Sequence, residues 1–188
     1  MQEFEGIWLD VDVAELEGKL KELGAERVGE YLYRRKVFDY PDLRLDSDGA
    51  WVRLRDEGEK VTLTFKKRIR GEAHGKDEGM IEHEVEVSDF ETTARLLESI
   101  GLALKFYEEN KRVRWQLDGV EFDFDTWPML ETYLEIESSS DENVDAAAQK
   151  LGLDLSDKFV CSTMQIYEMK GINEKDYKEI TFERCIKR

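Results

Sequence analysis

The 188-residue sequence has few residues that form covalent or metal cross-links, with only two cysteines and two histidines. Cys161 and Cys185 are too few for a disulfide framework or a cysteine-based zinc site, so a reducing cytoplasm is the simplest expected setting. No signal peptide is recognisable and no apolar run is long enough to span a bilayer. These absences predict a soluble, cytoplasmic protein without a membrane partner.

Positive charge is also scarce, because 44 acidic residues against 28 Lys and Arg give a net charge of −16. Nucleic-acid binders draw much of their affinity from neutralising phosphates, so this balance argues against a nucleic-acid partner. It remains compatible with a metal-loaded site or with a locally basic pocket on an acidic body. With two prolines and no low-complexity linker, the sequence predicts one domain over residues 1–188.

Three segments have the apolar period and the flanking signals of helices. Each begins after a residue whose side chain caps a helix, and each ends at a glycine. In the second segment, Glu91 stands three residues after Ser88, which predicts a capping box. The expected helices follow Asp12, Ser88 and Ser140 and end at Gly24, Gly101 and Gly152.

The remaining sequence alternates between apolar and polar residues, as half-buried strands do. An Asp118-Gly119 pair predicts a hairpin between two of these strands. About eight strands with a few helices indicate an α+β fold, whose antiparallel sheet is large enough to curl into a barrel. The expected strands occupy residues 3–7, 31–39, 50–56, 60–68, 80–87, 111–119, 120–125 and 132–137.

When the residues of each strand are sorted by parity, the charges gather on one face. Some strands carry only carboxylates on this face, whereas others carry arginine or lysine. Solvated strand faces more often mix Thr, Lys, Gln and Ser. The charged face comprises Glu5, Arg53, Arg55, Lys66, Glu82, Glu84, Glu86, Arg112, Arg114, Glu121, Asp123, Asp125, Glu135 and Glu137.

Two interpretations of this face stay open. In one, it meets water or merely pairs its charges inside a structural barrel. In the other, it lines the inside of a barrel and needs compensating charges. A polyanion matches the arginines and lysine, and a divalent cation matches the carboxylates. The second interpretation indicates metal-assisted transfer at a triphosphate.

The ordered set of Glu3-x-Glu5, VRLR, LTFK, EHEVEV, an Asn-Lys-Arg stretch and FDTWPMLETYLEIE resembles the CYTH superfamily, from Glu3 to about Lys170. These triphosphate tunnel enzymes include class IV adenylyl cyclases, thiamine triphosphatases and inorganic triphosphatases. The resemblance implies a closed, eight-stranded antiparallel β-barrel with flanking helices. It also implies a homodimer.

The resemblance further implies a role for each matched residue and a Mg²⁺ or Mn²⁺ cofactor. The basic set would bind a triphosphate, namely tripolyphosphate, ATP or thiamine triphosphate. Glu82 and Glu84 match the family's central acidic strand. The implied triphosphate binders are Arg53, Arg55, Lys66, Arg112 and Arg114; the implied metal ligands are Glu3, Glu5, Asp125, Glu135 and Glu137; the implied catalytic residues are Glu5, Glu135 and Glu137.

The sequence departs from the family at its start, where the Glu-x-Glu-x-Lys signature is written EFEGI and Ile7 replaces the lysine. Lys67, Arg35 or Arg114 would have to supply the missing charge. The leading prediction is metal-dependent hydrolysis of a triphosphate. The alternatives are a class IV adenylyl cyclase that forms cyclic AMP and pyrophosphate, or a catalytically weakened nucleotide or polyphosphate sensor.

Overall fold

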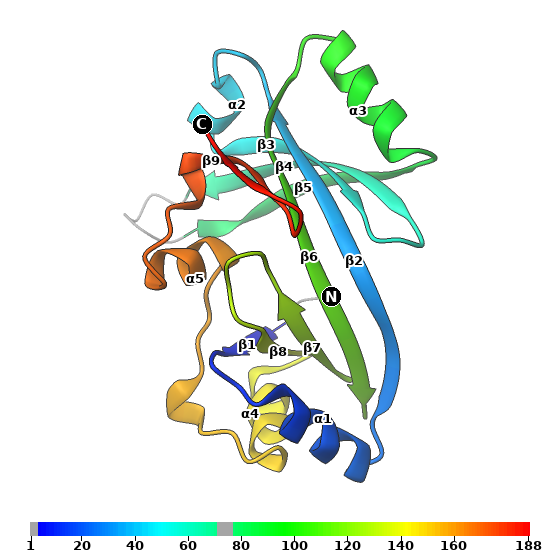
Figure 1. Ribbon diagram of the computed structural model, residues 1–188, viewed down its shortest axis with the longest axis vertical. Coiled ribbons are helices and arrows are strands. Elements are labelled where there is room, and N and C mark those ends of the chain that lie inside the picture. The colour runs from blue at the N-terminus through cyan, green and yellow to red at the C-terminus, as the bar shows by residue number, and fades with distance from the viewer. Residues whose placement is uncertain (1–3, 71–76) are drawn as a thin grey trace. The chain divides into compact units, whose positions relative to one another are not determined.

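The computed structural model describes residues 4–70 and 77–188, which divide into two compact units (Figure 1). The first unit comprises Met1–Tyr31 and Asn110–Asp176. The second comprises Leu32–Glu109 and Tyr177–Arg188. Two long strands, β2 and β6, contribute residues to both. Glu3 of the predicted metal ligands lies outside the described residues.

Two of the three predicted helix caps are confirmed, and the third is wrong. Asp12 accepts a hydrogen bond from the Glu15 backbone N, and Ser140 caps its helix in the same way. The second helix is capped by Asp89, not by Ser88, because Asp89 is the extended residue that accepts from the Thr92 backbone N. The α-helices are α1 (Val13–Glu22), α2 (Arg44–Ser47), α3 (Phe90–Ser99), α4 (Asp141–Lys150) and α5 (Thr163–Met169), with 3₁₀ turns η1 (Leu155–Asp157) and η2 (Glu174–Asp176).

All eight predicted strands form, and two short strands follow them. The hairpin at residues 118–119 is confirmed, since both residues have the positive φ that a type I′ turn requires. The strands are β1 (Phe4–Trp8), β2 (Glu26–Asp39), β3 (Ala50–Asp56), β4 (Val61–Arg70), β5 (Asp77–Val87), β6 (Ala103–Leu117), β7 (Val120–Thr126), β8 (Tyr133–Ser138), β9 (Tyr177–Ile180) and β10 (Cys185–Lys187).

The predicted closed, eight-stranded barrel is wrong, because the sheet is open and has ten strands. Its order is β1-β8-β7-β6-β2-β3-β4-β5, with β9 on β6 and β10 on β9. Closure would need β1 to pair with β5, and the described residues show no such pairing. Instead, the outer side of β1 bridges Phe159, since Ile7 and Phe159 exchange backbone N–H···O bonds of 2.8 and 2.9 Å.

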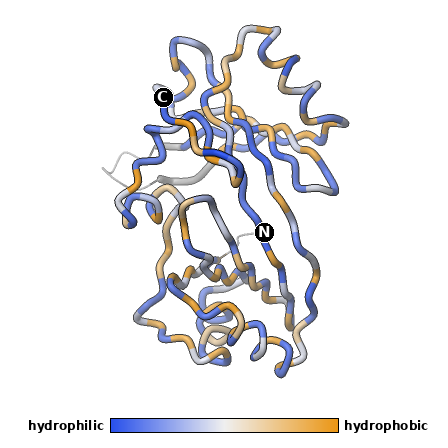
Figure 2. Tube along the Cα trace, viewed as in Figure 1, coloured by the Kyte–Doolittle hydropathy of each residue, from blue (hydrophilic) through white to orange (hydrophobic). Residues whose placement is uncertain are grey.

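In the first unit, α1 and α4 cover one face of the sheet that β1, β8, β7 and the end of β6 form (Figure 1). Hydrophobic and hydrophilic residues alternate along strands such as β7 (Figure 2), so this covered face is the apolar one. Its core includes Trp8, Leu20, Phe124, Leu134 and Val144. Burying such side chains stabilises the unit and leaves the charged parity on the opposite face.

In the second unit, α3 packs on β3. The core gathers Phe38 and Leu54 from the strands and Phe90, Ala94 and Leu97 from the helix. The side of β2 and β3 that carries Phe38 and Leu54 therefore faces α3. Arg34 and Lys36 of β2 lie on that side, over the Phe90 ring. Arg53 and Arg55 lie on the opposite parity of β3. None of the described helices is both long and apolar enough to cross a membrane.

Candidate functional site

The first unit holds a carboxylate face, defined as the polar parity of β1, β8 and β7. Register sets its geometry, because Glu5 lies opposite Glu137 and Glu135 lies opposite Asp123. Residues directly opposite in an antiparallel pair have Cβ atoms only about 5 Å apart. The carboxylates of this face are Glu5, Glu121, Asp123, Asp125, Glu135 and Glu137.

Arg112 of β6 is the main cation of the carboxylate face. Its Nε donates to Asp125 Oδ1 at 2.8 Å, its Nη1 lies 2.6 Å from Asp123 Oδ2, and its Nη2 lies 3.0 Å from Glu135 Oε1. Burial lowers the pKa of Arg112, but the bond to Asp125 and the surrounding carboxylates outweigh burial and raise it. Arg112 is therefore a fixed charge that ties three carboxylates of two strands together.

Arg114 makes a second, separate pairing on the same face. It donates two bonds to Asp123, from Nε at 2.8 Å and Nη2 at 2.6 Å, and its Nη1 lies 2.8 Å from Glu121 Oε2. The bonds to Asp123 raise the pKa of Arg114. Both arginines predicted to bind triphosphate from this strand are thus engaged by carboxylates within the unit.

The carboxylates are not neutralised by these two arginines. Burial raises the pKa of Glu135 to about 7, although the charge of Arg112 opposes the rise, and the charges of Asp125, Glu5 and Asp123 add to it. Burial also raises the pKa of Glu5, with Arg112 again opposing. A bound cation would favour the ionised forms of Glu135 and Glu5.

The donor chemistry fits a hard divalent metal, since carboxylate oxygens suit Mg²⁺ and Mn²⁺. Among the described residues, no three His, Cys, Asp or Glu side chains are grouped closely enough to hold a metal by themselves. Mg²⁺ does not need such a cage, because it commonly uses one or two carboxylates plus substrate phosphates and water. Glu5 and Glu135, the two carboxylates whose pKa is raised, fit that mode.

Ile7 lies on the carboxylate face, opposite Glu135, and is only 2% exposed. The cations predicted to replace the signature lysine differ in the unit to which they belong and in their partners. Lys67 belongs to the second unit and pairs with Asp48, whereas Arg114 reaches Asp123 and Glu121. The cation that contacts Glu135 is Arg112.

The second unit holds an arginine face on the polar parity of β2, β3 and β4. Arg35 lies directly opposite Arg55, and Arg53 lies opposite Val37 on one side and Thr64 on the other. Like charges placed opposite each other across a sheet are destabilising. This face therefore concentrates guanidinium groups without a carboxylate directly opposite on β2 or β4.

The arginine face has unsatisfied donors. The Nε atoms of Arg53 and Arg55 are buried and have no hydrogen-bond partner in the described part of the chain. Burial, together with the neighbouring charges of Arg55 and Arg35, lowers the pKa of Arg53 to about 10. Buried donors without partners cost free energy unless an acceptor satisfies them, and an oxyanion would do so for both.

Carboxylates of β5 flank the arginine face. Glu84 accepts a 2.7 Å hydrogen bond from Thr64 Oγ1 and lies 4.0 Å from Arg53 Nη2, and Lys66 pairs with Glu82. Glu82 and Glu84 are more exposed than their partners. The predicted acidic strand thus holds Arg53 and Lys66 in place from the rim of the face.

The structure groups the predicted residues into two sets, one in each unit. Glu5, Asp125, Glu135, Glu137, Arg112 and Arg114 are brought together in the first unit, and Arg53, Arg55, Lys66, Glu82 and Glu84 in the second. Two contributors had no assigned role as triphosphate binder or metal ligand in the predicted site, namely Asp123, which both arginines contact, and Arg35. Parity places Asp123 on the charged face, but its contacts and the cross-strand position of Arg35 depend on register.

Several solved structures share this fold. A protein of Pyrococcus horikoshii is 21% identical with a TM-score of 0.63, over 87% of this chain and 98% of its own. A proposed adenylate cyclase of Vibrio parahaemolyticus is 16% identical with a TM-score of 0.68, over 88% and 97%. A proposed adenylyl cyclase from Hippeastrum, described as having a dominant triphosphatase activity, is 16% identical with a TM-score of 0.58, over 90% and 95%.

No curated protein sequence matches the chain. The model of the CYTH domain family, however, matches residues 10–166. The matched range contains β3 with Arg53 and Arg55, β6 with Arg112 and Arg114, and β8, and it begins after β1. With most of its length matched and its fold shared, the chain belongs to the CYTH domain family.

Proposed function

We propose that this protein is a divalent-metal-dependent enzyme that hydrolyses a triphosphate. The observation that carries the proposal is the arginine face, where the buried Nε atoms of Arg53 and Arg55 lack partners. Burial, and then the neighbouring charges of Arg55 and Arg35, lower the pKa of Arg53. Glu84 contacts Arg53 and Glu57 contacts Arg55 through the Nη2 atoms of the two guanidinium groups. A polyphosphate would therefore supply acceptors for the Nε atoms and further opposite charge.

The arginines are proposed to bind the phosphate oxygens and to stabilise the charge that develops as the phosphorus–oxygen bond breaks. Guanidinium groups suit this role because they donate paired, planar hydrogen bonds. Lys66 adds a point charge, and Glu82 fixes its position through their ion pair. Arg112 and Arg114 are proposed to act mainly by holding the carboxylates, since their donors already contact Asp123, Asp125, Glu121 and Glu135.

Glu5 and Glu135 are the residues proposed to hold Mg²⁺ or Mn²⁺, with Glu137 and Asp125 beside them. When bound, such an ion would neutralise phosphate charge and lower the pKa of water. CYTH enzymes generally depend on a divalent metal. Glu135 has a second capability of its own, because a carboxyl with a pKa of about 7 holds or releases a proton near neutral pH.

One observation favours a second candidate, a binding protein with weak or no turnover. Ile7 places a hydrocarbon side chain next to Glu135, where the family signature has a lysine. The loss of this charge leaves the arginine face intact, so affinity for a polyphosphate would survive while catalysis weakened. A sensor of nucleotides or polyphosphate is the corresponding function.

The test is to incubate the purified protein with tripolyphosphate, ATP or thiamine triphosphate and Mg²⁺ or Mn²⁺, and to follow phosphate, pyrophosphate and cyclic AMP. Metal-dependent phosphate release is the expected result. Equal amounts of pyrophosphate and cyclic AMP from ATP would instead identify an adenylyl cyclase. Thermal stabilisation by tripolyphosphate without turnover would identify the sensor. Neither stabilisation nor turnover would overturn both proposals.

A further inference from the structure

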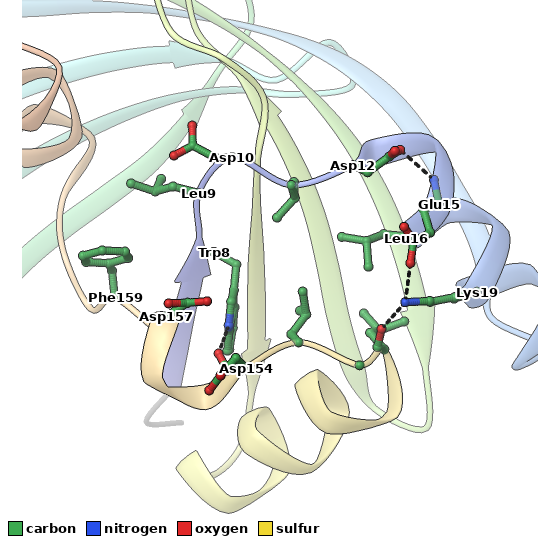
Figure 3. A pocket seen from close by; sticks show the side chains of 14 residues that line it. Trp8, Leu9, Asp10, Asp12, Glu15, Leu16, Lys19, Asp154, Asp157 and Phe159 are labelled. Carbon is green, nitrogen blue, oxygen red and sulfur yellow. Dashed lines mark hydrogen bonds and ion pairs between the residues drawn. The ribbon is translucent and has the colours of Figure 1, made fainter.

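A groove in the first unit lies away from the carboxylate face. It has a volume of about 640 Å³ and is formed by the end of β1, the start of α1 and the loop after α4 (Figure 3). Trp8, Leu16 and Leu151, all buried core residues, supply its apolar floor, and the exposed ring of Phe159 lies at one end. A hollow of this size suits a drug-sized group or a few peptide side chains.

The rim of this groove is acidic. It carries five carboxylates, two of which already pair with lysines: Glu15 with Lys19 at 2.7 Å and Asp10 with Lys170 at 2.8 Å. The carboxylates of Asp12 and Asp154 accept hydrogen bonds from uncharged donors, the Glu15 and Ser156 backbone N–H groups among them. The five rim residues are Asp10, Asp12, Glu15, Asp154 and Asp157.

The groove continues as a line of hollows along the seam between α1 and α4. Lys19, whose Nζ donates to the Leu151 carbonyl at 2.8 Å, lines both the first hollow and a second one of about 450 Å³. Leu23 and Lys150 line that second hollow and a third of about 130 Å³. The three hollows therefore adjoin one another, and the acidic one lies at β1.

We propose that this groove binds an extended basic peptide segment of a partner protein. Apolar side chains of the segment would cover the floor, and its lysines or arginines would pair with the acidic rim. Charge complementarity excludes a second copy of this chain as the favoured occupant, because its net charge is −16. Because the hollows adjoin one another, a chain-like ligand could occupy more than one of them, which favours it over a compact ligand. This role is independent of the triphosphate proposal.

The test uses a fluorescein-labelled hexapeptide of alternating Lys and Leu, with binding followed by fluorescence anisotropy in about 0.1 M salt, where exposed charges still interact over about 10 Å. The double variant Asp154→Asn/Asp157→Asn should weaken binding about fivefold to tenfold, as expected for two lost surface ion pairs with the peptide. Asparagine at residue 154 keeps a side-chain oxygen that can accept from the Ser156 backbone N. The matched control, Glu168→Gln/Glu183→Gln, changes net charge equally outside the groove and should bind as wild type.

A second pair of variants tests the apolar contact without changing charge. Phe159→Ala removes the ring but keeps the backbone bridge to Ile7, and it should weaken binding, whereas Val160→Ala, exposed but outside the groove lining, should not. This pair of variants tests peptide binding by the groove if the double variant fails to fold. Equal loss in the matched controls, or unchanged affinity in both groove variants, would overturn the proposal. So would spermine displacing the peptide at equal concentration, since a small cation would then suffice.

Discussion

Ile7 lies directly opposite Glu135 in the antiparallel pairing of β1 with β8. The two side chains share the carboxylate face, so a buried hydrocarbon lies next to a half-buried carboxylate. Arg112 Nη2, 3.0 Å from Glu135 Oε1, is the cation that contacts this carboxylate. Because Arg112 also contacts Asp123 and Asp125, Glu135 shares its cation with two other acids.

Ile7→Lys should raise catalytic efficiency. A lysine at this position would place an ammonium group beside Glu135 and lower the pKa of that carboxyl. An increase of roughly tenfold in kcat/KM for tripolyphosphate with Mg²⁺ corresponds to about 1.4 kcal/mol of added charge stabilisation. Ile7→Met is the control, since it keeps the length without the charge. Equal gains in both variants would show that packing, not charge, limits activity.

Arg53→Ala should abolish most of the thermal stabilisation by tripolyphosphate. A hydrogen bond to a charged group is worth about 1.5–3 kcal/mol, so affinity should fall roughly tenfold to a hundredfold. Arg53→Lys should recover only part of it, because an ammonium cannot donate in the paired geometry of a guanidinium. Arg27→Ala removes an equal charge at an exposed Arg27–Glu30 pair and should leave binding unchanged. Wild-type binding by Arg53→Ala would refute the phosphate role of the arginine face.

Stability should fall as pH rises from about 4.5 to about 7, to the extent that Glu135 governs it. Its pKa is higher in the folded protein than the ordinary value of 4.5, so the folded state binds more protons in this window. Ionising Glu135 therefore opposes folding, by up to roughly 3 kcal/mol at neutral pH. Glu135→Gln should flatten this part of the pH profile of the free energy of unfolding, measured by urea denaturation. A profile identical to wild type would contradict the assignment.

The proton of the Glu135 carboxyl also links metal binding to pH. Because a metal requires the ionised carboxylate, binding of Mg²⁺ or Mn²⁺ should release a proton and tighten as pH rises through about 7. Calorimetry in buffers of different ionisation enthalpy would count that proton. Glu135→Gln should remove the proton release, and Glu121→Gln, whose carboxylate pairs with Arg114, should not.

Gly6→Ala should destabilise the first unit. A Cβ at Gly6 would lie 2.8 Å from Lys158 Cε and 2.9 Å from the buried Trp8 ring, and relieving such overpacking costs about 1–3 kcal/mol. Gly18→Ala is the contrasting control, because its Cβ meets nothing within 4 Å and α1 gains helix propensity. The melting temperature should fall in the first variant and rise in the second. A rise in both would mean that Lys158 moves away without cost.

Local rules were sufficient for most elements. Asp12 and Ser140 were predicted as caps because a short polar side chain before an apolar period satisfies free N–H groups of the first turn. The same rule failed at Ser88, since Asp89 next to it has equal capping ability and the correct position. Parity correctly placed Glu135 and Arg112 on one face, because side-chain direction in a strand is a local property.

What could not be predicted depends on pairing between distant segments. The barrel was expected to close, but no local sequence pattern predicts that Phe159 pairs with Ile7 on the outer side of β1. Likewise, parity gave the face of Arg112 but not its partners. Whether a guanidinium meets phosphate or Asp123, Asp125 and Glu135 depends on register across three strands.

The bridge between Ile7 and Phe159 also bears on the order of folding during synthesis. β1 is made early, yet its two neighbours, β8 and Phe159, lie more than a hundred residues later in the chain. Such distant pairings form slowly because a long loop must close first. During synthesis, Glu5 and Ile7 therefore cannot complete their strand pairing until β8 and Phe159 have left the ribosome. We therefore expect β1, which is synthesised before β8, to complete its backbone pairing late in folding.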